Sequence, residues 1–287
     1  EIGSGLVGSE MCIRDRYDTG ASTADIQPGE EVSCYDLLAA LLIPSSCEAA
    51  NIIALNVSDS ITGFTDLMNE KAEKLGMENT HFSNAHGLWA QQNYSSCKDM
   101  ATLCEYAISK YQVFRDIVCL PSYHMASTSY HSDGTDIYNT NLMLDSMTDY
   151  YYSYAKGIKT GTLDSAGRCL ASYAEYEGTT YLIVTMGAPM DKLEEDVKKG
   201  EEDPDSIYGG DNVYYNLLDH ISLYKWAFSS LVATDFVDKN SEVRDVKVSY
   251  GDGIDYANLK PANGFTRLWP VDLSLIHISE PTRPEPI

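Results

Sequence analysis

The feature that most constrains this fold is a change in hydrophobic period along the chain. Residues 33–43 repeat leucine with the period of a helix, whereas residues 169–176 and 180–187 are short runs without that period and are candidate strands. The intervening residues Glu177-Gly178-Thr179 are typical of a hairpin turn. Helices followed by an antiparallel hairpin predict an α+β protein whose antiparallel sheet is flanked by helices.

Capping patterns set the expected element boundaries. Ser33 with Asp36 three residues later marks a helix start, and Pro44 ends that helix. By the same rules, further helices are predicted over 49–57, 61–75, 96–110 and 213–231. The predicted strands cover 154–161, 169–176, 180–187 and 243–250, and the acidic stretch 190–211 is expected to be a surface loop.

The charge balance excludes some partners. With 20 Lys and Arg against 43 Asp and Glu, the net charge is −23, which argues against nucleic-acid binding because phosphates require clustered cations. No stretch reaches the ~20 apolar residues of a membrane helix. The seven cysteines show no paired zinc-site spacing, so we expect thiols, no bound metal and no cofactor.

Both ends look foreign to the rest of the chain. Residues 1–16 and 273–287 fit neither the neighbouring periodicity nor any capping pattern, and they resemble translated sequencing-adapter sequence. We therefore expect genuine sequence from about Tyr17 to about Asp272, truncated at both ends. Residues 17–235 would form the main domain, and 236–272 would begin a small C-terminal β domain.

The strongest chemical signal is Lys159-Thr160-Gly161, at the end of a predicted strand. A lysine there can hold an anionic carboxylate while the strand edge pairs with a peptide. Alone, such a triplet is commonly an ordinary strand end. Its context is more specific: Gly157-Ile158 precede it, and Asp164-Ser165-Ala166-Gly167 and then a hairpin follow.

A second signal is Pro44-Ser45-Ser46-Cys47-Glu48-Ala49-Ala50, between two predicted helices. Together with the Lys159 segment, it resembles the serine D-Ala-D-Ala carboxypeptidases, the small penicillin-binding proteins. That family has a Ser-x-Asn triad here, so Ser45 matches its serine and Cys47 replaces its asparagine. A thiol is a poor substitute for an amide, which both donates and accepts hydrogen bonds.

The resemblance implies a β-lactamase/transpeptidase-like fold with a helical subdomain, and an extracytoplasmic enzyme. Such an enzyme removes the terminal D-Ala from peptidoglycan stem peptides through an acyl-enzyme and binds β-lactams. Ser45 would relay a proton, and Lys159 would supply charge to the relay and to the substrate carboxylate. Cys47, Thr160, Gly161 and Thr162 would contact the substrate, with an amide near Thr162 in the oxyanion hole.

The family's nucleophile lies in a Ser-x-x-Lys motif before this triad, and residues 17–44 contain no such motif. The literal match Ser95-Ser96-Cys97-Lys98 lies after the triad and resembles a family helix cap instead. We therefore expect the printed chain to be inactive. Apolar side chains of residues 37–42 and 52–55 should then be exposed to solvent, or covered by a misplaced tail, where the missing helix would pack.

Two alternatives remain open. A serine β-lactamase of the same fold would need an added general base, for which no matching acid is evident. A non-catalytic cell-wall-binding protein would use some of the 21 tyrosines to stack on glycans. It would leave the complete Lys159 motif unexplained. His81 and His86 are expected to be structural, and not metal ligands or bases.

Overall fold

Helices dominate the first half of the chain in the computed structural model, which describes residues 6–7, 21–210, 212–237, 239, 242, 244–247 and 256–271. These helices are α2 (Cys34–Leu42), α3 (Cys47–Ser58), α4 (Ile61–Lys74), α5 (Cys97–Lys110) and α6 (Gln112–Val118). The first four begin at serine caps, each accepting a hydrogen bond from the backbone N–H three residues on. The predicted helices are confirmed, although α3 starts two residues before residue 49.

The three-stranded antiparallel sheet has the order β5-β6-β7. Its strands are β5 (Ala155–Leu163), β6 (Gly167–Tyr176) and β7 (Thr179–Ala188), which confirms the predicted strands and hairpin. Glu177 and Gly178 at the turn both have positive φ, the conformation that a tight two-residue hairpin requires. A separate hairpin, β3 (Ser122–Met125) with β4 (Thr135–Tyr138), was not predicted.

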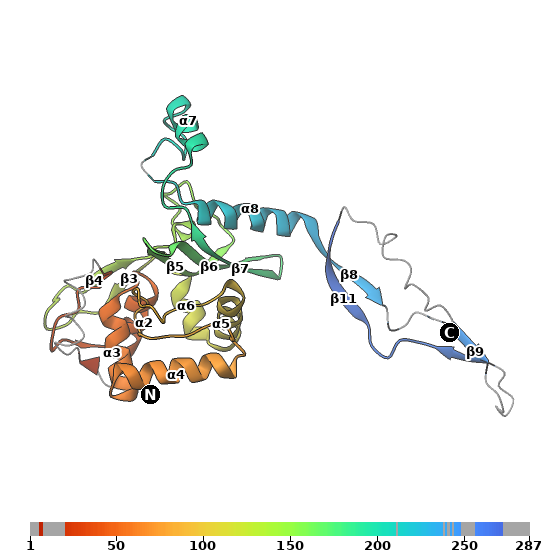
Figure 1. The fold of residues 1–287 in the computed structure, drawn as a ribbon, viewed down its shortest axis with the longest axis horizontal. Helices are drawn as coiled ribbons and strands as arrows, with labels where there is room; N and C mark the ends of the chain where they lie inside the picture. The colour runs from red at the N-terminus through yellow and green to blue at the C-terminus, as the bar shows by residue number, and fades with distance from the viewer. Residues whose placement is uncertain are drawn as a thin grey trace. The chain divides into compact units, whose positions relative to one another are not determined.

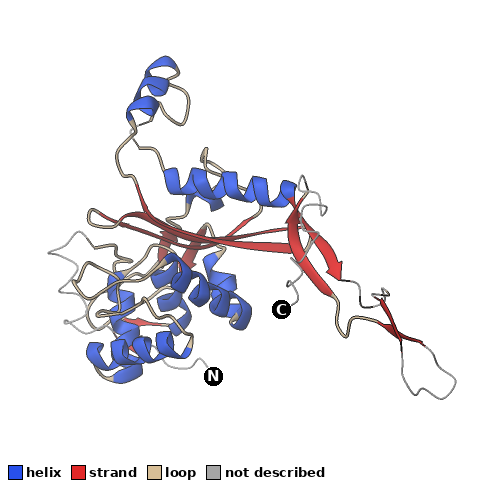
Figure 2. Ribbon diagram, turned by 45° about the vertical axis from the view of Figure 1, so that its right-hand side comes forward, coloured by secondary structure: helices blue, strands red, loops and turns tan. Residues whose placement is uncertain are grey.

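Helices cover both faces of this sheet, so the first part of the chain is layered (Figures 1 and 2). Helices α5 and α6 pack on one face, where Cys104, Val118 and Tyr173 form a buried cluster. On the other face lies the first part of α8 (Tyr215–Ser230), where His220 bonds to Ser172 of β6 at 2.7 Å. This arrangement confirms the predicted α+β class.

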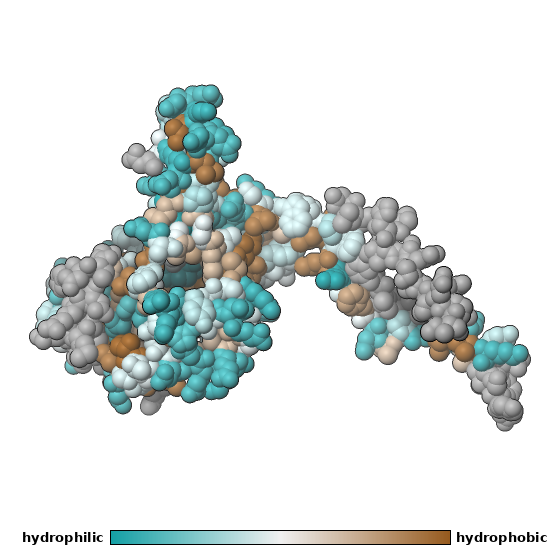
Figure 3. Space-filling view, viewed as in Figure 1, coloured by the Kyte–Doolittle hydropathy of each residue, from teal (hydrophilic) through white to brown (hydrophobic). Residues whose placement is uncertain are grey.

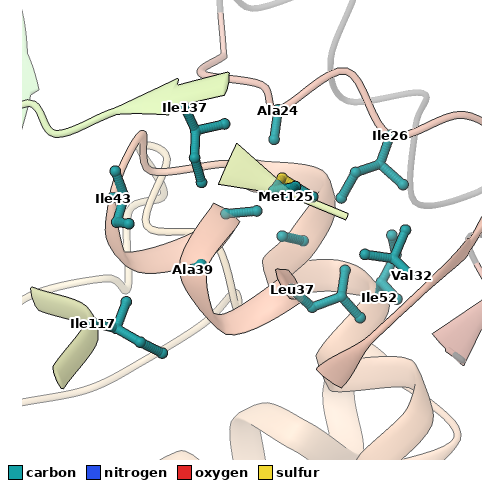
Figure 4. Close-up of a cluster of buried hydrophobic side chains, with 12 residues drawn as sticks. Ala24, Ile26, Val32, Leu37, Ala39, Ile43, Ile52, Ile117, Met125 and Ile137 are labelled. Carbon is teal, nitrogen blue, oxygen red and sulfur yellow. The ribbon is translucent and has the colours of Figure 1, made fainter. Parts of the chain in front are cut away.

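A second core lies inside the helical subdomain, around α2 (Figure 4). Leu37 and Ile52 are fully buried in it, which corrects the expectation that α2 and α3 would present these side chains to solvent. Neighbouring leucines of α2 are only partly buried. The correction has a simple cause: residues 24–32 and the β3–β4 hairpin cover this face of α2.

A bulge in β5 sets the register of the segment that follows it. The pairing with β6 shifts between Ala155 and Ile158. Gly157 has φ +106°, and a Cβ there would lie 2.4 Å from the carbonyl oxygen of Val118. Glycine is therefore required at this position, and beyond it Lys159 pairs opposite Ala171.

The acidic stretch predicted as a loop contains a helix, α7 (Glu194–Glu202). Its first turn carries Glu194, Glu195 and Asp196, which favour the positive N-terminal end of a helix. Asp196 also accepts hydrogen bonds from Lys199 and Tyr215. The prediction failed because this helix depends on polar contacts and carries almost no apolar stripe.

The chain divides into two compact units, Glu1–Ser222 and Leu223–Ile287. The division falls within α8. The domain boundary expected at residue 236 stays a prediction. The second unit contains β8 (Leu231–Val237) paired with β11 (Phe265–Pro270), and β9 (Arg244–Lys247) paired with β10 (Tyr256–Leu259). Most of the segment 1–16, and all of 273–287, lie outside the described residues.

The visible surface over the helices of the first unit is largely hydrophilic (Figure 3), as expected for so acidic a chain. Among the helices that the structure describes, none combines the length and apolar character needed to cross a bilayer.

Candidate active site

A cavity of about 670 Å³ opens in the first unit where the helical subdomain meets the end of β5. Its lining includes Ser45 and Cys47 from the α2–α3 junction. It also includes Thr160, Gly161 and Thr162 from β5. The structure therefore gathers five of the six predicted site residues around one space, although the two segments are about a hundred residues apart in the sequence.

Ser45 adopts a strained backbone conformation at the cavity wall. Its φ is +71°, in the left-handed region that costs a non-glycine residue about 1–2 kcal/mol. Hydrogen bonds from the two residues that follow Ser45 hold this geometry: Ser46 N–H donates to the Ala40 carbonyl at 2.9 Å, and Cys47 N–H to the Ser22 carbonyl at 3.0 Å. Strain retained in this way is common at functional sites.

Cys47 is the first residue of α3 and is buried, with 5% of its surface exposed. It lines the cavity. The next residue, Glu48, ties the helix start to the preceding segment by accepting from Thr23 Oγ1 at 2.6 Å and Ala24 N–H at 2.7 Å.

Lys159 precedes Thr160 on β5, and it is not among the lining residues that the structure describes. Its Nζ donates to the Thr160 carbonyl at 3.2 Å. Burial lowers the pKa of Lys159 to about 8, an effect that the neighbouring Cys47 thiol partly offsets. A lysine titrating near neutrality can serve both as a charge and as a proton carrier. Because the resemblance places Ser45 and Lys159 in one proton relay, their side chains should lie close enough for a hydrogen bond, directly or through one water. This contact stays a prediction.

The Thr160–Thr162 segment lies on the outer strand of the sheet. Within the described residues β5 pairs with β6 alone, so its other edge can receive a peptide. The Thr160 hydroxyl hydrogen-bonds to the Thr140 hydroxyl. A Cβ added to Gly161 would meet only Cys169 Cβ, at 3.7 Å, which is ordinary contact. The fold therefore does not need a glycine at 161, and any requirement for it comes from the cavity.

Sequence reasoning missed several residues of the cavity wall. The loop 86–89, assigned to the structural framework, contributes His86 and the 69% exposed Trp89. Arg168 and Asn216 also line the cavity. No motif marks these side chains, although Arg168 could have been placed near the site from its position just after the hairpin turn of the Lys159 strand. His81 stacks on Tyr94 and bonds to the Gln92 carbonyl, which fits a structural role.

The Ser95–Lys98 match does not form a site at this cavity. Ser96, and not Ser95, caps α5, whereas the Ser95 hydroxyl bonds to Thr80 Oγ1 at 2.8 Å. Two other segments share the spacing, Ser153–Lys156 and Ser222–Lys225. Ser153–Lys156 runs from a turn into β5, where residues three apart face opposite sides. None of the three serines belongs to the cavity lining that the structure describes.

The cysteines of the described chain are thiols, and none of them is joined in a disulfide. Burial raises the pKa of Cys104 to about 11, so this thiol is a packing residue. Among the described residues, no group of three or more His, Cys, Asp or Glu side chains is arranged to hold a metal ion.

Comparison with known proteins agrees with this geometry. The chain matches the family model of D-alanyl-D-alanine carboxypeptidase, peptidase family S11, over residues 7–190. That range begins inside the segment 1–16 that the sequence sets apart. The chain is 30% identical over 177 residues to the D-alanyl-D-alanine carboxypeptidase DacF of Bacillus subtilis, covering 60% of this chain and 42% of that protein. It is 31% identical to DacC of Escherichia coli, covering 61% and 41%. The chain thus spans less than half the length of these relatives.

Solved structures give the same result. The Streptomyces K15 DD-transpeptidase superposes with a TM-score of 0.60 at 28% identity, covering 66% of this chain and 73% of that one. Penicillin binding protein 5 from Haemophilus influenzae superposes with a TM-score of 0.67 over 95% of this chain and 69% of its own. At 21% identity, this second likeness concerns the fold alone. The chain belongs to the D-alanyl-D-alanine carboxypeptidase family, peptidase family S11.

Proposed function

We propose that this chain carries most of the substrate site of a serine-type D-Ala-D-Ala carboxypeptidase that binds β-lactams and acts outside the cytoplasm. The observation that carries the proposal is the meeting of the α2–α3 junction and the β5 edge at one cavity, with the buried side chain of Lys159 on the same strand. A peptide that pairs along this edge runs past Thr160, Gly161 and Thr162, as a substrate ending in D-Ala-D-Ala must.

The reaction assigns a role to each of these groups. A serine hydroxyl attacks the penultimate D-Ala carbonyl, and the bond to the terminal D-Ala breaks as Ser45 passes a proton to the leaving amine. Water then hydrolyses the acyl-enzyme. Lys159 provides charge for the relay and for the substrate carboxylate, while an amide near Thr162 stabilises the oxyanion. The Cys47 thiol anchors the substrate less well than an amide would.

The attacking serine belongs, in this proposal, to a Ser-x-x-Lys segment that precedes residue 17 in the parent protein. A helix is needed because it places the lysine one turn from the serine. The printed chain then retains the binding surface without the nucleophile, and we expect it to bind substrate without turning it over.

The test is D-Ala release by the chain joined to its natural upstream segment. Lys159→Ala should reduce release more than tenfold, a loss of over about 1.4 kcal/mol of transition-state stabilisation. Lys156→Ala is the matched control, because Lys156 lies near the start of the same strand, within the bulge, and borders a separate surface hollow with Glu175 and Tyr176. Lys159→Ala activity within tenfold of the unmodified protein would remove Lys159 from the mechanism.

A further inference from the structure

The cavity rim carries an exposed indole that no role above explains. Trp89 lines the cavity, yet 69% of its surface is exposed. Its ring makes no hydrogen bond, aromatic contact or cation–π contact with any residue that the structure describes. Tyr94, an exposed aromatic residue at the end of the same loop, is stacked on His81 instead. Trp89 therefore presents an unused apolar face beside the space where substrate would lie.

A network of hydrogen bonds fixes the loop that holds this ring. The backbones of His81 and Tyr94 bond to each other in both directions, at 2.9 and 3.0 Å, and close the loop. Inside it, Asn84 Oδ1 accepts from Gly87 N–H at 2.7 Å, and Asn84 Nδ2 donates to the Leu88 carbonyl at 2.9 Å. The indole follows directly after this braced turn. Because such a loop is already ordered, a ligand that contacts the ring pays little entropy to fix it.

The same loop supplies a hydrogen-bond donor to the cavity. Asn93 lines the cavity, and its Oδ1 accepts from Ser83 N–H at 3.2 Å. That bond makes Nδ2 the end of the amide that is left to donate. Nδ2 bonds to no group that the structure describes, and it retains surface accessible to solvent. The loop therefore offers an accessible N–H donor together with an aromatic face.

These two groups match one part of a peptidoglycan stem better than the others. The stem residues before D-Ala-D-Ala are short or charged, and they have no extended apolar face. The N-acetylated amino sugar that carries the stem has an apolar face of ring C–H groups and an acetamido carbonyl that accepts hydrogen bonds. An indole suits a ligand that is apolar on one side and wet on the other. The described cavity lining contains no carboxylate that would favour a ligand cation over the ring.

We propose that Trp89 and Asn93 bind the N-acetylated amino sugar at the start of a stem peptide. The sugar ring lies on the indole, and its acetamido carbonyl accepts a hydrogen bond from Asn93 Nδ2. The inference rests on the proposed function, in which the D-Ala-D-Ala end of the same stem lies at the β5 edge. It adds a substrate preference: stems that are still attached to sugar bind more tightly than stem peptides without sugar.

The experiment compares two ligands that share one stem peptide ending in D-Ala-D-Ala and carry the same charge. The amino end bears N-acetylmuramic acid in one ligand and an acetyl group in the other. Calorimetric titration into the printed chain measures Kd for each ligand, since binding needs no nucleophile. We expect the sugar-bearing ligand to bind at least fivefold more tightly. Trp89→Ala should remove this advantage without changing the Kd of the acetylated peptide, whereas Trp89→Phe should keep part of it.

Two further variants separate this contact from effects on the fold. Trp226→Ala removes another indole, 52% exposed and in the second unit, and should leave both Kd values unchanged. Asn93→Asp keeps the acceptor for Ser83 N–H but loses the donor, so it should reduce the ratio of the two Kd values at least twofold. The ratio is the readout because the added charge acts equally on two ligands of equal charge.

Indole emission gives a second readout. The chain has three tryptophans, and replacing Trp226 and Trp269 by phenylalanine leaves Trp89 as the sole indole. The sugar-bearing ligand should shift the emission to shorter wavelength because the sugar ring displaces water from the indole face. The acetylated peptide should leave the emission unchanged.

The outcomes distinguish this inference from the proposed function. Equal affinities of the unmodified chain for both ligands would overturn the inference and leave the proposed function standing. Equal weakening of both ligands by Trp89→Ala would also overturn the inference, because the ring would then contact the peptide and not the sugar. If neither ligand bound the unmodified chain, the inference and the proposed function would both fall.

Discussion

At the scale of single residues, different physical effects act on the side chains of the site: backbone strain at Ser45 and burial at Lys159. Ser45 is held in a left-handed conformation by the hydrogen bonds of its neighbours. The pKa of Lys159 falls to about 8 because the side chain is buried. Motif order predicted that these two residues, with Cys47 and residues 160–162, share a site. Arg168, Trp89 and Asn216 were not predicted, because their importance arises from burial and position, which one sequence does not display.

The titration of Lys159 gives a pH dependence of known sign. Below about pH 8 the ammonium is charged and attracts the terminal carboxylate of a D-Ala-D-Ala peptide. Above that pH the charge is lost, so affinity should fall, with a midpoint shifted upward because the bound carboxylate favours the protonated form. Calorimetry from pH 6.5 to 10 measures the curve. Lys159→Arg, which stays charged, should flatten it, and an affinity that rises with pH would contradict the assignment.

Gly161 and Gly157 lie on one strand, but the fold requires a glycine only at position 157. Gly161→Ala should keep or raise stability by roughly 0.5 kcal/mol, because the new Cβ meets only Cys169 and alanine restricts the unfolded chain. It should nevertheless weaken peptide binding by narrowing the cavity. Gly157→Ala is the control and should unfold at lower denaturant, since its Cβ would meet Val118 at 2.4 Å. Urea titration measures the stability of each variant, and calorimetry measures its peptide affinity. Unchanged peptide affinity of Gly161→Ala would contradict the claim that the cavity requires glycine at this position.

At the scale of elements, sequence reasoning succeeded where the pattern was local. Helices α2, α4 and α5 have serine caps and apolar stripes, and β6 and β7 flank a two-residue turn. The β3–β4 hairpin, α6 and α7 were missed. The hairpin strands have only four residues each and α6 has seven. Such short segments depend on tertiary contacts more than on their own periodicity.

The α2–α3 junction offers a matched pair of adjacent serines. Ser46 caps α3 by accepting from Ala49 N–H at 3.1 Å, so Ser46→Ala should cost about 1 kcal/mol of unfolding free energy. Ser45→Gly removes left-handed strain and should cost nothing. In the parent protein the order reverses: Ser45→Gly should abolish D-Ala release, and Ser46→Ala should retain it. Urea denaturation and D-Ala release test this, and loss of activity in both variants would argue for a purely structural junction.

At the scale of the whole molecule, family and function concentrate in the first unit. The family match over residues 7–190 and the described residues of the cavity lining precede residue 223, where the second unit begins. The change from helical to strand-forming segments was enough to predict an antiparallel sheet flanked by helices in this unit. A continuous helix such as α8 carries no sequence signal at the point where its contacts change, so the sequence does not mark the division at residue 223.

The central claim is that the cavity between Ser45 and the Lys159 strand is a carboxypeptidase site whose nucleophile lies upstream. Fluorescent penicillin followed by denaturing electrophoresis tests it most directly, on the printed chain and on the chain with its natural upstream segment. We predict a labelled band for the longer protein, lost on Lys159→Ala, and no band for the printed chain. A covalent adduct on the printed chain, above all at Cys47 or Ser95, would contradict the account.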